Sequence, residues 1–127
     1  MSDMNSKGVN VRVKSTYRPE RSFPGENYYF FSYRVTVRND GRETVQLLSR
    51  RWIITDADGN VQEVQGKGVV GEQPVLGPGE SFEYTSFCPL KTAVGSMHGS
   101  YVMITSSGEE FDVTIHPFTL AVPTAVN

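Results

Sequence analysis

The chain has 127 residues, of which 38% are hydrophobic and 20% charged, so it fits one domain with a packed core and not a disordered segment. Lys plus Arg number 12 and Asp plus Glu number 14, and the formal net charge of -2 argues against a nucleic acid partner. The single cysteine, Cys88, excludes an internal disulfide framework and a cysteine-rich metal site.

The N-terminal residues 1–8 are predicted to be a flexible segment. They contain no apolar run of the kind that a signal peptide needs after its positive region. The most apolar stretch, Tyr28 to Phe31, is far shorter than the ~18 residues of a membrane-spanning helix. We therefore expect no membrane insertion, and a cytoplasmic location, which also agrees with the lack of disulfides.

The first half of the chain alternates apolar and polar residues, which is typical of strands with one buried face. Strands are predicted at 9–17, 28–39 and 44–55. Because Asn39-Asp40-Gly41 tolerates positive φ, we expect a hairpin between the second and third of these. The apolar phase of the third strand changes sides near Leu47, which predicts a β-bulge or bend there.

The second half continues with a short strand at 61–65 and further strands at 80–87, 100–106 and 110–118, the last two joined by a Ser107-Gly108 turn. Between them, residues 66–79 are so rich in glycine and proline that we expect an exposed loop. Apolar residues nowhere follow a helical period, so we expect almost no helix.

These patterns predict an all-β fold, an antiparallel β-sandwich of about seven or eight strands with immunoglobulin-like or fibronectin type III-like architecture. The domain should span residues 9–118, followed by a C-terminal tail at 119–127. Trp52 is expected in the core, and Tyr101, placed at the start of the penultimate strand, is a candidate for the tyrosine corner of such sandwiches.

The string Gly66-Lys67-Gly68-Val69-Val70-Gly71 has the spacing of a dinucleotide-binding fingerprint. That fingerprint needs a helix after the glycines, and Pro74 and Gly77-Pro78-Gly79 exclude one, so a Rossmann site is rejected. Two readings remain. The segment is either a plain connection or a phosphate-binding loop, in which backbone amides and the Lys67 ammonium hold an anion; its candidate residues are Gly66, Lys67, Gly68 and Gly71.

Residues for catalysis or metal binding are sparse, and we assign no catalytic residue. Cys88 precedes a proline at a strand end and is read as a buried structural thiol. The weak metal candidates are His98, His116 and Asp112, which have no recognised ligand spacing. His116 shares the phase of Asp112 and should face solvent, whereas His98 is placed in a glycine-rich connection.

A local cationic and aromatic surface is also indicated by the sequence. The alternative interpretation, which we favour, is a solvated strand edge whose charges prevent pairing with other chains. The residues concerned are Arg50, Arg51, Arg18 and Arg21, with Tyr17 and Phe23 nearby.

Six strings of the sequence can be compared together: Val11-Arg12-Val13, Tyr33 to Asn39, Leu48 to Trp52, Gly66 to Pro74, Leu76 to Glu80 and Met97 to Tyr101. Together they resemble the bacterial ApaG family from about residue 9 to 117. The resemblance implies a fibronectin type III-like sandwich and a genetic link to cobalt resistance and magnesium efflux, often beside a diadenosine tetraphosphatase gene. Similar eukaryotic domains belong to an F-box protein and to a DNA polymerase delta-interacting protein. The family's glycine motif, which has prompted suggestions of pyrophosphate binding, corresponds to Gly66, Gly68 and Gly71.

The function expected from this sequence is a non-enzymatic binding module that recognises a protein partner and needs no cofactor. The alternative is recognition of a nucleotide, pyrophosphate or polyphosphate through residues 66–71. A third hypothesis, direct handling of cobalt or magnesium, draws on the family link. Edge strands of the sandwich could also pair two copies into a homodimer.

Overall fold

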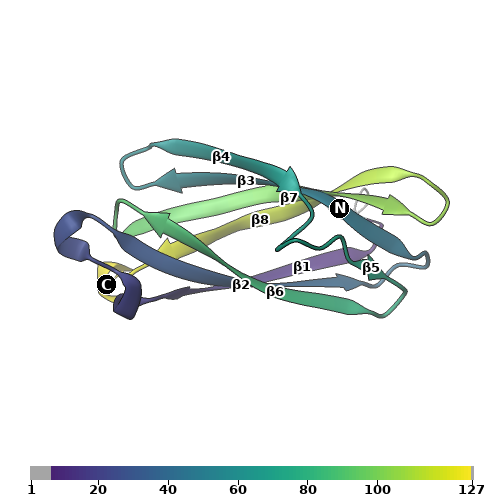
Figure 1. Cartoon of the computed structure of the whole chain (residues 1–127), viewed down its shortest axis with the longest axis horizontal. Coiled ribbons are helices and arrows are strands. Elements are labelled where there is room, and N and C mark those ends of the chain that lie inside the picture. Colours follow the sequence, from purple (N-terminus) through teal and green to yellow (C-terminus); the bar gives the residue numbers. More distant parts are fainter. Residues whose placement is uncertain (1–6, 127) are drawn as a thin grey trace.

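The computed structural model describes residues 7–126 as two antiparallel sheets that pack face to face, which confirms the predicted all-β sandwich (Figure 1). One sheet has the strand order β1-β2-β6 and the other β4-β3-β7-β8, with β5 paired to β3. The bounds of the strands are β1 Val9–Tyr17, β2 Tyr29–Asn39, β3 Val45–Asp56, β4 Val61–Lys67, β5 Val75–Leu76, β6 Ser81–Leu90, β7 Val94–Thr105 and β8 Glu110–Ala121.

Helical structure among residues 7–126 is limited to short 3₁₀ turns, and none of them is long and apolar enough to span a membrane. The turns are η2 Pro19–Arg21, η3 Pro24–Glu26 and η4 Pro123–Val126. The expected near-absence of helix is therefore confirmed for these residues. The finer assignment to an immunoglobulin-like or fibronectin type III-like sandwich stays a prediction.

The expected hairpin between the second and third strands is wrong. β2 pairs with β1 and β6, whereas β3 pairs with β4, β5 and β7, so residues 40–44 cross from one sheet to the other. The crossing is held by the fully buried side chain of Asn39, whose amide nitrogen donates to the carbonyls of Glu43 (2.8 Å) and Leu76 (2.9 Å). Its amide oxygen accepts from the Gly41 N–H at 2.9 Å.

The alternation of apolar and polar residues predicted the position of Trp52 in the core correctly. Trp52 is buried and meets Tyr33, Tyr101 and Phe118 edge-on, with ring centroids 5.4, 6.4 and 5.9 Å away. The bulge expected near Leu47 is present, because the pairing of β3 with β7 shifts register between Leu47 and Ser49. An extra residue in one strand moves the following side chains to the other face, which explains why the apolar phase switches.

Several boundaries differ from those predicted: β4 extends to Lys67, β6 extends to Leu90, and β7 begins at Val94 and not at residue 100. The start of β7 was missed because its glycines look like a connection. They lie where the neighbouring chain leaves no room for a side chain, and a Cβ on Gly99 would lie 1.9 Å from the Arg51 carbonyl oxygen. β8 continues to Ala121 and Leu120 is fully buried, so the sandwich includes residues assigned to the C-terminal tail. Of the N-terminal segment predicted at 1–8, residues 1–6 lie outside the described residues.

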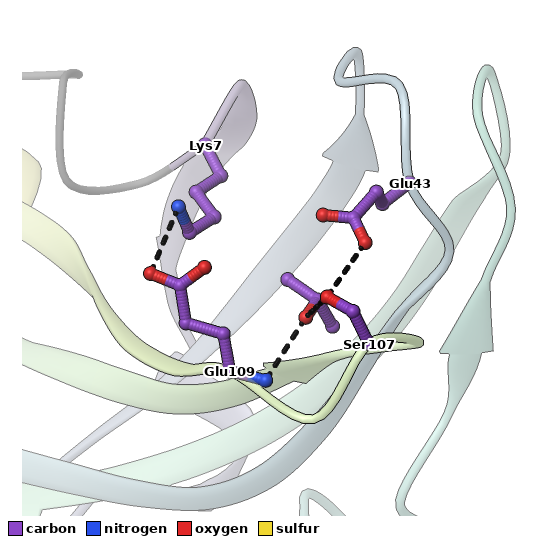
Figure 2. Close-up of polar contacts among 5 residues, drawn as sticks. Lys7, Glu43, Ser107 and Glu109 are labelled. Carbon is purple, nitrogen blue, oxygen red and sulfur yellow. Dashed lines mark hydrogen bonds and ion pairs between the residues drawn. The ribbon is translucent and has the colours of Figure 1, made fainter.

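Polar contacts join the β7–β8 turn to Lys7, which precedes β1, and to Glu43 on the crossing between the sheets (Figure 2). Lys7 Nζ lies 3.2 Å from a Glu109 carboxylate oxygen, and the Ser107 hydroxyl donates to Glu43 at 2.9 Å. The buried Thr105 hydroxyl accepts from the Glu109 N–H at 3.1 Å. These contacts close this end, whereas η2, η3 and the β3–β4 turn lie at the other end (Figure 1).

Replacing Trp52 by alanine should lower the free energy of unfolding by about 3–5 kcal/mol, because the substitution removes a buried aromatic ring and leaves a cavity between the sheets. Urea unfolding followed by circular dichroism measures the change. Thr114→Ala on the exposed face of β8 is the matched control and should change stability by less than about 0.5 kcal/mol. Equal effects of the two substitutions would contradict the placement of Trp52 in the core.

Candidate functional site

The glycine segment, residues 66–79, is not the exposed loop that the sequence predicted. Gly66 and Lys67 are the last residues of β4, and Val69 is fully buried in the core. The segment beyond β4 turns at Gly68, where φ is +66°, and then rejoins β3 further along in the same direction, as β5 opposite Val45 and Gln46. No α-helix follows it, in agreement with the rejection of a Rossmann site, because the next element is the strand β5.

The bulge in β3 anchors this segment. The carbonyl of Leu48, the extra residue of the bulge, accepts hydrogen bonds from the Gly68 N–H (2.8 Å) and from the Gln73 side-chain amide (2.9 Å). The Arg50 guanidinium donates to the carbonyls of Lys67 (3.2 Å) and Gly68 (2.9 Å). The alternation that predicted the bulge could not reveal these bonds, since they join residues about 20 positions apart.

The amides of the candidate phosphate loop are partly engaged in backbone hydrogen bonds. Gly68 donates to Leu48, and Val69 and Glu72 donate to each other's carbonyls at 2.8 and 2.9 Å, which closes a two-residue turn over Val70 and Gly71. An anion nest needs several amides directed at one point. This geometry therefore leaves the Lys67 ammonium as the chief candidate group for binding an anion.

Val70, at the tip of that turn, adopts a φ of +48° and its side chain is 61% exposed. Positive φ is unusual for a β-branched residue and stores strain that the rest of the turn must hold in place. Gly71, with φ at +79°, takes the second position, where a glycine has no such penalty. The turn thus presents a strained apolar side chain to solvent.

A shallow hollow of about 570 Å³ on the outer face of the larger sheet brings together two sets of predicted residues. Gly66 and Lys67 line it, and so does Asp112 of β8. Arg51 also lines the hollow, but its guanidinium forms an ion pair with Glu63 at 2.7 Å, and this hydrogen bond lowers the pKa of the Glu63 carboxyl. Of the cations that line the hollow, Arg51 is therefore already paired with a carboxylate.

The two histidines lie on neighbouring strands of the larger sheet. His98 is an exposed residue of β7, so its placement in a glycine-rich connection is wrong. The pairing of β7 with β8 shifts register at His98, opposite His116, and both side chains are exposed. Within residues 7–126, however, no three His, Cys, Asp or Glu side chains are grouped to hold a metal ion. Weak cation binding by His98, His116 and Asp112 stays a prediction.

A buried polar cluster lies between the sheets. Tyr101 is in the middle of β7, not at its start, and its hydroxyl hydrogen-bonds the Tyr84 hydroxyl of the opposite sheet and not the backbone, so the expected tyrosine corner is wrong. Burial raises the pKa of both hydroxyls above the ordinary value. The Cys88 thiol is buried as predicted, and burial raises its pKa to about 11.

These shifts predict that the protein loses stability in alkali. A group whose pKa is raised by folding contributes full stability below its unfolded pKa and loses it as the pH rises towards the folded value. For Cys88 this window runs from its ordinary value of 9.0 to about 11. The slope should be at most about 1.4 kcal/mol per pH unit for one proton.

Urea unfolding at several pH values measures this dependence. Between pH 9.0 and about 11, Cys88→Ala should lose stability less steeply than the unmodified chain, and Thr114→Ala should lose it equally steeply. Identical slopes for Cys88→Ala and the unmodified chain would rule out a thiol that is protonated by burial.

The end of the sandwich where η2 and η3 lie carries an aromatic surface, formed by Arg21, Phe23, Tyr28, Phe30 and Phe87, of which Phe30 is buried and the others are exposed. The η3 turn and the antiparallel bridge between Phe23 and Tyr28 bring these two rings within 6.3 Å. Phe30 stacks on Phe87 at 5.4 Å. The Arg21 guanidinium lies 4.3 Å from the Phe30 ring and 5.3 Å from the Phe87 ring, in cation–π contact.

Sequence reasoning found only part of this surface. It grouped Arg18, Arg21 and Phe23 with Arg50 and Arg51, but the latter two lie on β3 in the other sheet. Tyr17 packs against the buried Phe31 at 5.4 Å. The missed residues are Tyr28, Phe30 and Phe87. The sequence could have indicated Phe87, because this large aromatic residue shares its alternation phase in β6 with the exposed polar residues Glu83 and Thr85.

A groove of about 420 Å³ continues the aromatic surface between the outermost strands of the two sheets. Tyr28 belongs to both features. The groove's apolar lining comes from Ile54 and Val61 on one sheet and from Pro89 and Leu90 on the other, with Asp56, Asn60, Gln62 and Lys91 as its polar lining. Exposed aromatic rings beside an apolar groove are typical of a protein-binding surface.

Comparison with known proteins places this fold in a family. The model of the ApaG domain matches residues 19–105. The chain belongs to the ApaG family. It is 56% identical to Protein ApaG of Anaeromyxobacter sp. (strain K) over the full length of both chains, and 54% identical to that of Azotobacter vinelandii over 94% of each. The resemblance inferred from the sequence is thereby confirmed.

A solved ApaG-type structure has the same architecture. The crystal structure of an ApaA protein from Bordetella pertussis superposes with a TM-score of 0.89 at 50% identity, covering 91% of this chain and 94% of the other. This shared sandwich is the framework on which the surfaces described above are built.

Proposed function

We propose that this ApaG-family chain is a non-enzymatic binding module that recognises a partner protein through its aromatic surface and the adjoining groove. The observation that carries the proposal is the exposure of Phe23 (59%) and Phe87 (51%) beside Arg21. Aromatic residues and arginine are enriched where binding energy concentrates in protein interfaces. The partner chemistry that fits is an apolar or aromatic side chain that enters the groove.

The non-enzymatic part of the proposal rests on where the reactive groups lie. The Cys88 thiol is buried and held protonated by its surroundings, whereas catalysis by cysteine needs an accessible thiolate and a base. His98 and His116 are exposed on the outer face of the other sheet. A nucleophile and a base within reach of each other would be needed for catalysis, and this arrangement separates them.

Site-specific photo-crosslinking tests the proposal. A photoreactive phenylalanine analogue at position 87 should form a discrete crosslinked product in cells, and the same analogue at position 114, on the exposed face of β8, should not. The captured protein is then purified and its Kd measured. Phe23→Ala should weaken binding at least about tenfold, equivalent to about 1.4 kcal/mol.

The outcomes of this experiment separate the alternatives. Equal labelling from positions 87 and 114, or an unchanged Kd for Phe23→Ala, would contradict the proposal. A product made of two copies of this chain would assign the surface to the homodimer that the exposed edge strands allow. As a control for folding, the variants should unfold at the same urea concentration as the unmodified chain.

The second candidate function is binding of a nucleotide or polyphosphate near residues 66–71. It is supported by the hollow in which Lys67 and Arg51 lie beside Gly66. If it holds, millimolar ATP shifts the amide NMR signals of residues 66–71, and Lys67→Ala abolishes the shifts while Lys91→Ala, an exposed lysine on the groove side, preserves them. A spectrum unchanged by ATP would dispose of this candidate.

A further inference from the structure

The outer face of the smaller sheet carries a concentration of cations, which we name the basic face: Arg12, Lys14, Arg18, Arg34 and Arg38. These are five of the 12 Lys and Arg residues of a chain whose net charge is -2. Arg12, Lys14, Arg34 and Arg38 are exposed strand residues, and Arg18 directly follows β1. The chain has a net negative charge, and the basic face is a local concentration of positive charge on it.

The arrangement of these cations opposes stability. Lys14 of β1 lies directly across from Arg34 of β2, and like charges at opposed positions of an antiparallel pair are destabilising. Arg34 and Arg38 have carboxylate partners, Glu83 at 3.0 Å and Asp40 at 2.6 Å. Among the ion pairs of residues 7–126, none includes Arg12, Lys14 or Arg18.

The basic face is also hollowed where an anion would lie. A depression of about 480 Å³ is lined by the cations Lys14, Arg18 and Arg34 and by one carboxylate, Glu83, which is the ion-pair partner of Arg34. Its remaining lining residues carry hydroxyl groups: Thr16, Ser32, Tyr84 and Thr85. The Ser32 hydroxyl accepts from Arg18 Nε at 2.8 Å, which fixes the guanidinium on the sheet. An arginine held in this way presents its remaining N–H groups to a carboxylate in bidentate geometry.

The basic face is continuous with the aromatic surface. Ser32 at the edge of the depression is paired across the sheet with Phe87, and Thr85 precedes Phe87 by two residues on the same face of β6. One extended segment can therefore contact cations at one end and aromatic rings at the other. The basic face can therefore bind part of the same partner segment that contacts the aromatic surface.

We propose that the partner contributes an extended acidic segment that crosses the basic face, with carboxylates at Lys14, Arg18 and Arg34 and an apolar side chain on the aromatic surface. The inference rests on the proposed function and names the chemistry of its partner. A single-stranded nucleic acid is the less favoured ligand, because the chain has a formal net charge of -2 and a polyanion draws its affinity from a large excess of cations.

A defined probe tests the inference. A synthetic glutamate-rich peptide that ends in Leu-Phe should shift the amide signals of β1, β2 and β6, and its affinity should fall as salt is raised. The same peptide with glutamine in place of glutamate should bind at least about tenfold more weakly. The double variant K14E/R18E should lose at least about tenfold in affinity. R42E, an exposed cation on the crossing at 40–44, should stay within about twofold and serves as the matched control.

Loss of binding cannot be ascribed to misfolding if stability is followed in parallel. Lys14→Glu places a carboxylate opposite Arg34, so its urea midpoint should rise or stay level. K14Q/R18Q, which removes charge without reversing it, should give an intermediate affinity. A glutamate peptide that binds K14E/R18E as well as the unmodified chain would overturn the inference, and so would a single-stranded oligonucleotide that binds the basic face more tightly than the peptide.

The inference and the proposed function can fail separately. If K14E/R18E leaves the affinity of the crosslinked partner unchanged while Phe23→Ala weakens it, the acidic segment is wrong and the aromatic surface stands. If Phe23→Ala has no effect while K14E/R18E abolishes peptide binding, the basic face binds anions independently and the proposed function is wrong.

Discussion

The buried side-chain amide of Asn39 holds the point at which the chain leaves one sheet for the other. Its hydrogen bonds to Glu43 and Leu76 tie the crossing to β5 and, through β5, to β3. A buried amide that loses such partners carries a large desolvation penalty, so this connection is strongly specified. Because β2 and β3 lie in different sheets, the cations of β1 and β2 share one outer face while the glycine segment adjoins the other.

Local pattern predicted the strands well, because a two-residue period records directly which side chains are buried. It found Trp52 in the core and the bulge near Leu47. It did not predict which strands pair. The residues Asn39-Asp40-Gly41 favour a turn, and such a turn is compatible both with a hairpin and with a crossing between sheets. The partners that decide between them, Glu43 and Leu76, include one that is 37 residues away. Gly95 and Gly99 misled for a similar reason, because their close neighbours belong to distant segments.

The candidate surfaces were less predictable than the fold because each combines segments that are distant in sequence. The aromatic surface joins residues of the η2–η3 region to Phe87 of β6, and no short motif spans that separation. The glycine motif was recognised from its spacing, but the structure gives much of it a structural role: Gly66 packs on the Arg50 guanidinium, and Gly68 binds the bulge. The spacing of the glycines shows where the backbone can adopt unusual conformations, whereas the contacts of each glycine show why the fold needs it there.

The argument for function on the smaller sheet is one departure from favourable charge pairing. Arg51 and Glu63 on the larger sheet, and Arg34 and Glu83 on the smaller sheet, form ion pairs across neighbouring strands, an arrangement that favours stability. Lys14, however, lies directly opposite Arg34, although a carboxylate or a hydroxyl at position 14 would relieve the repulsion. A fold with a core built on Trp52 and its three aromatic neighbours tolerates that penalty. Local departures from the most stable arrangement are expected at functional sites, and here the departure lies directly beside exposed aromatic rings.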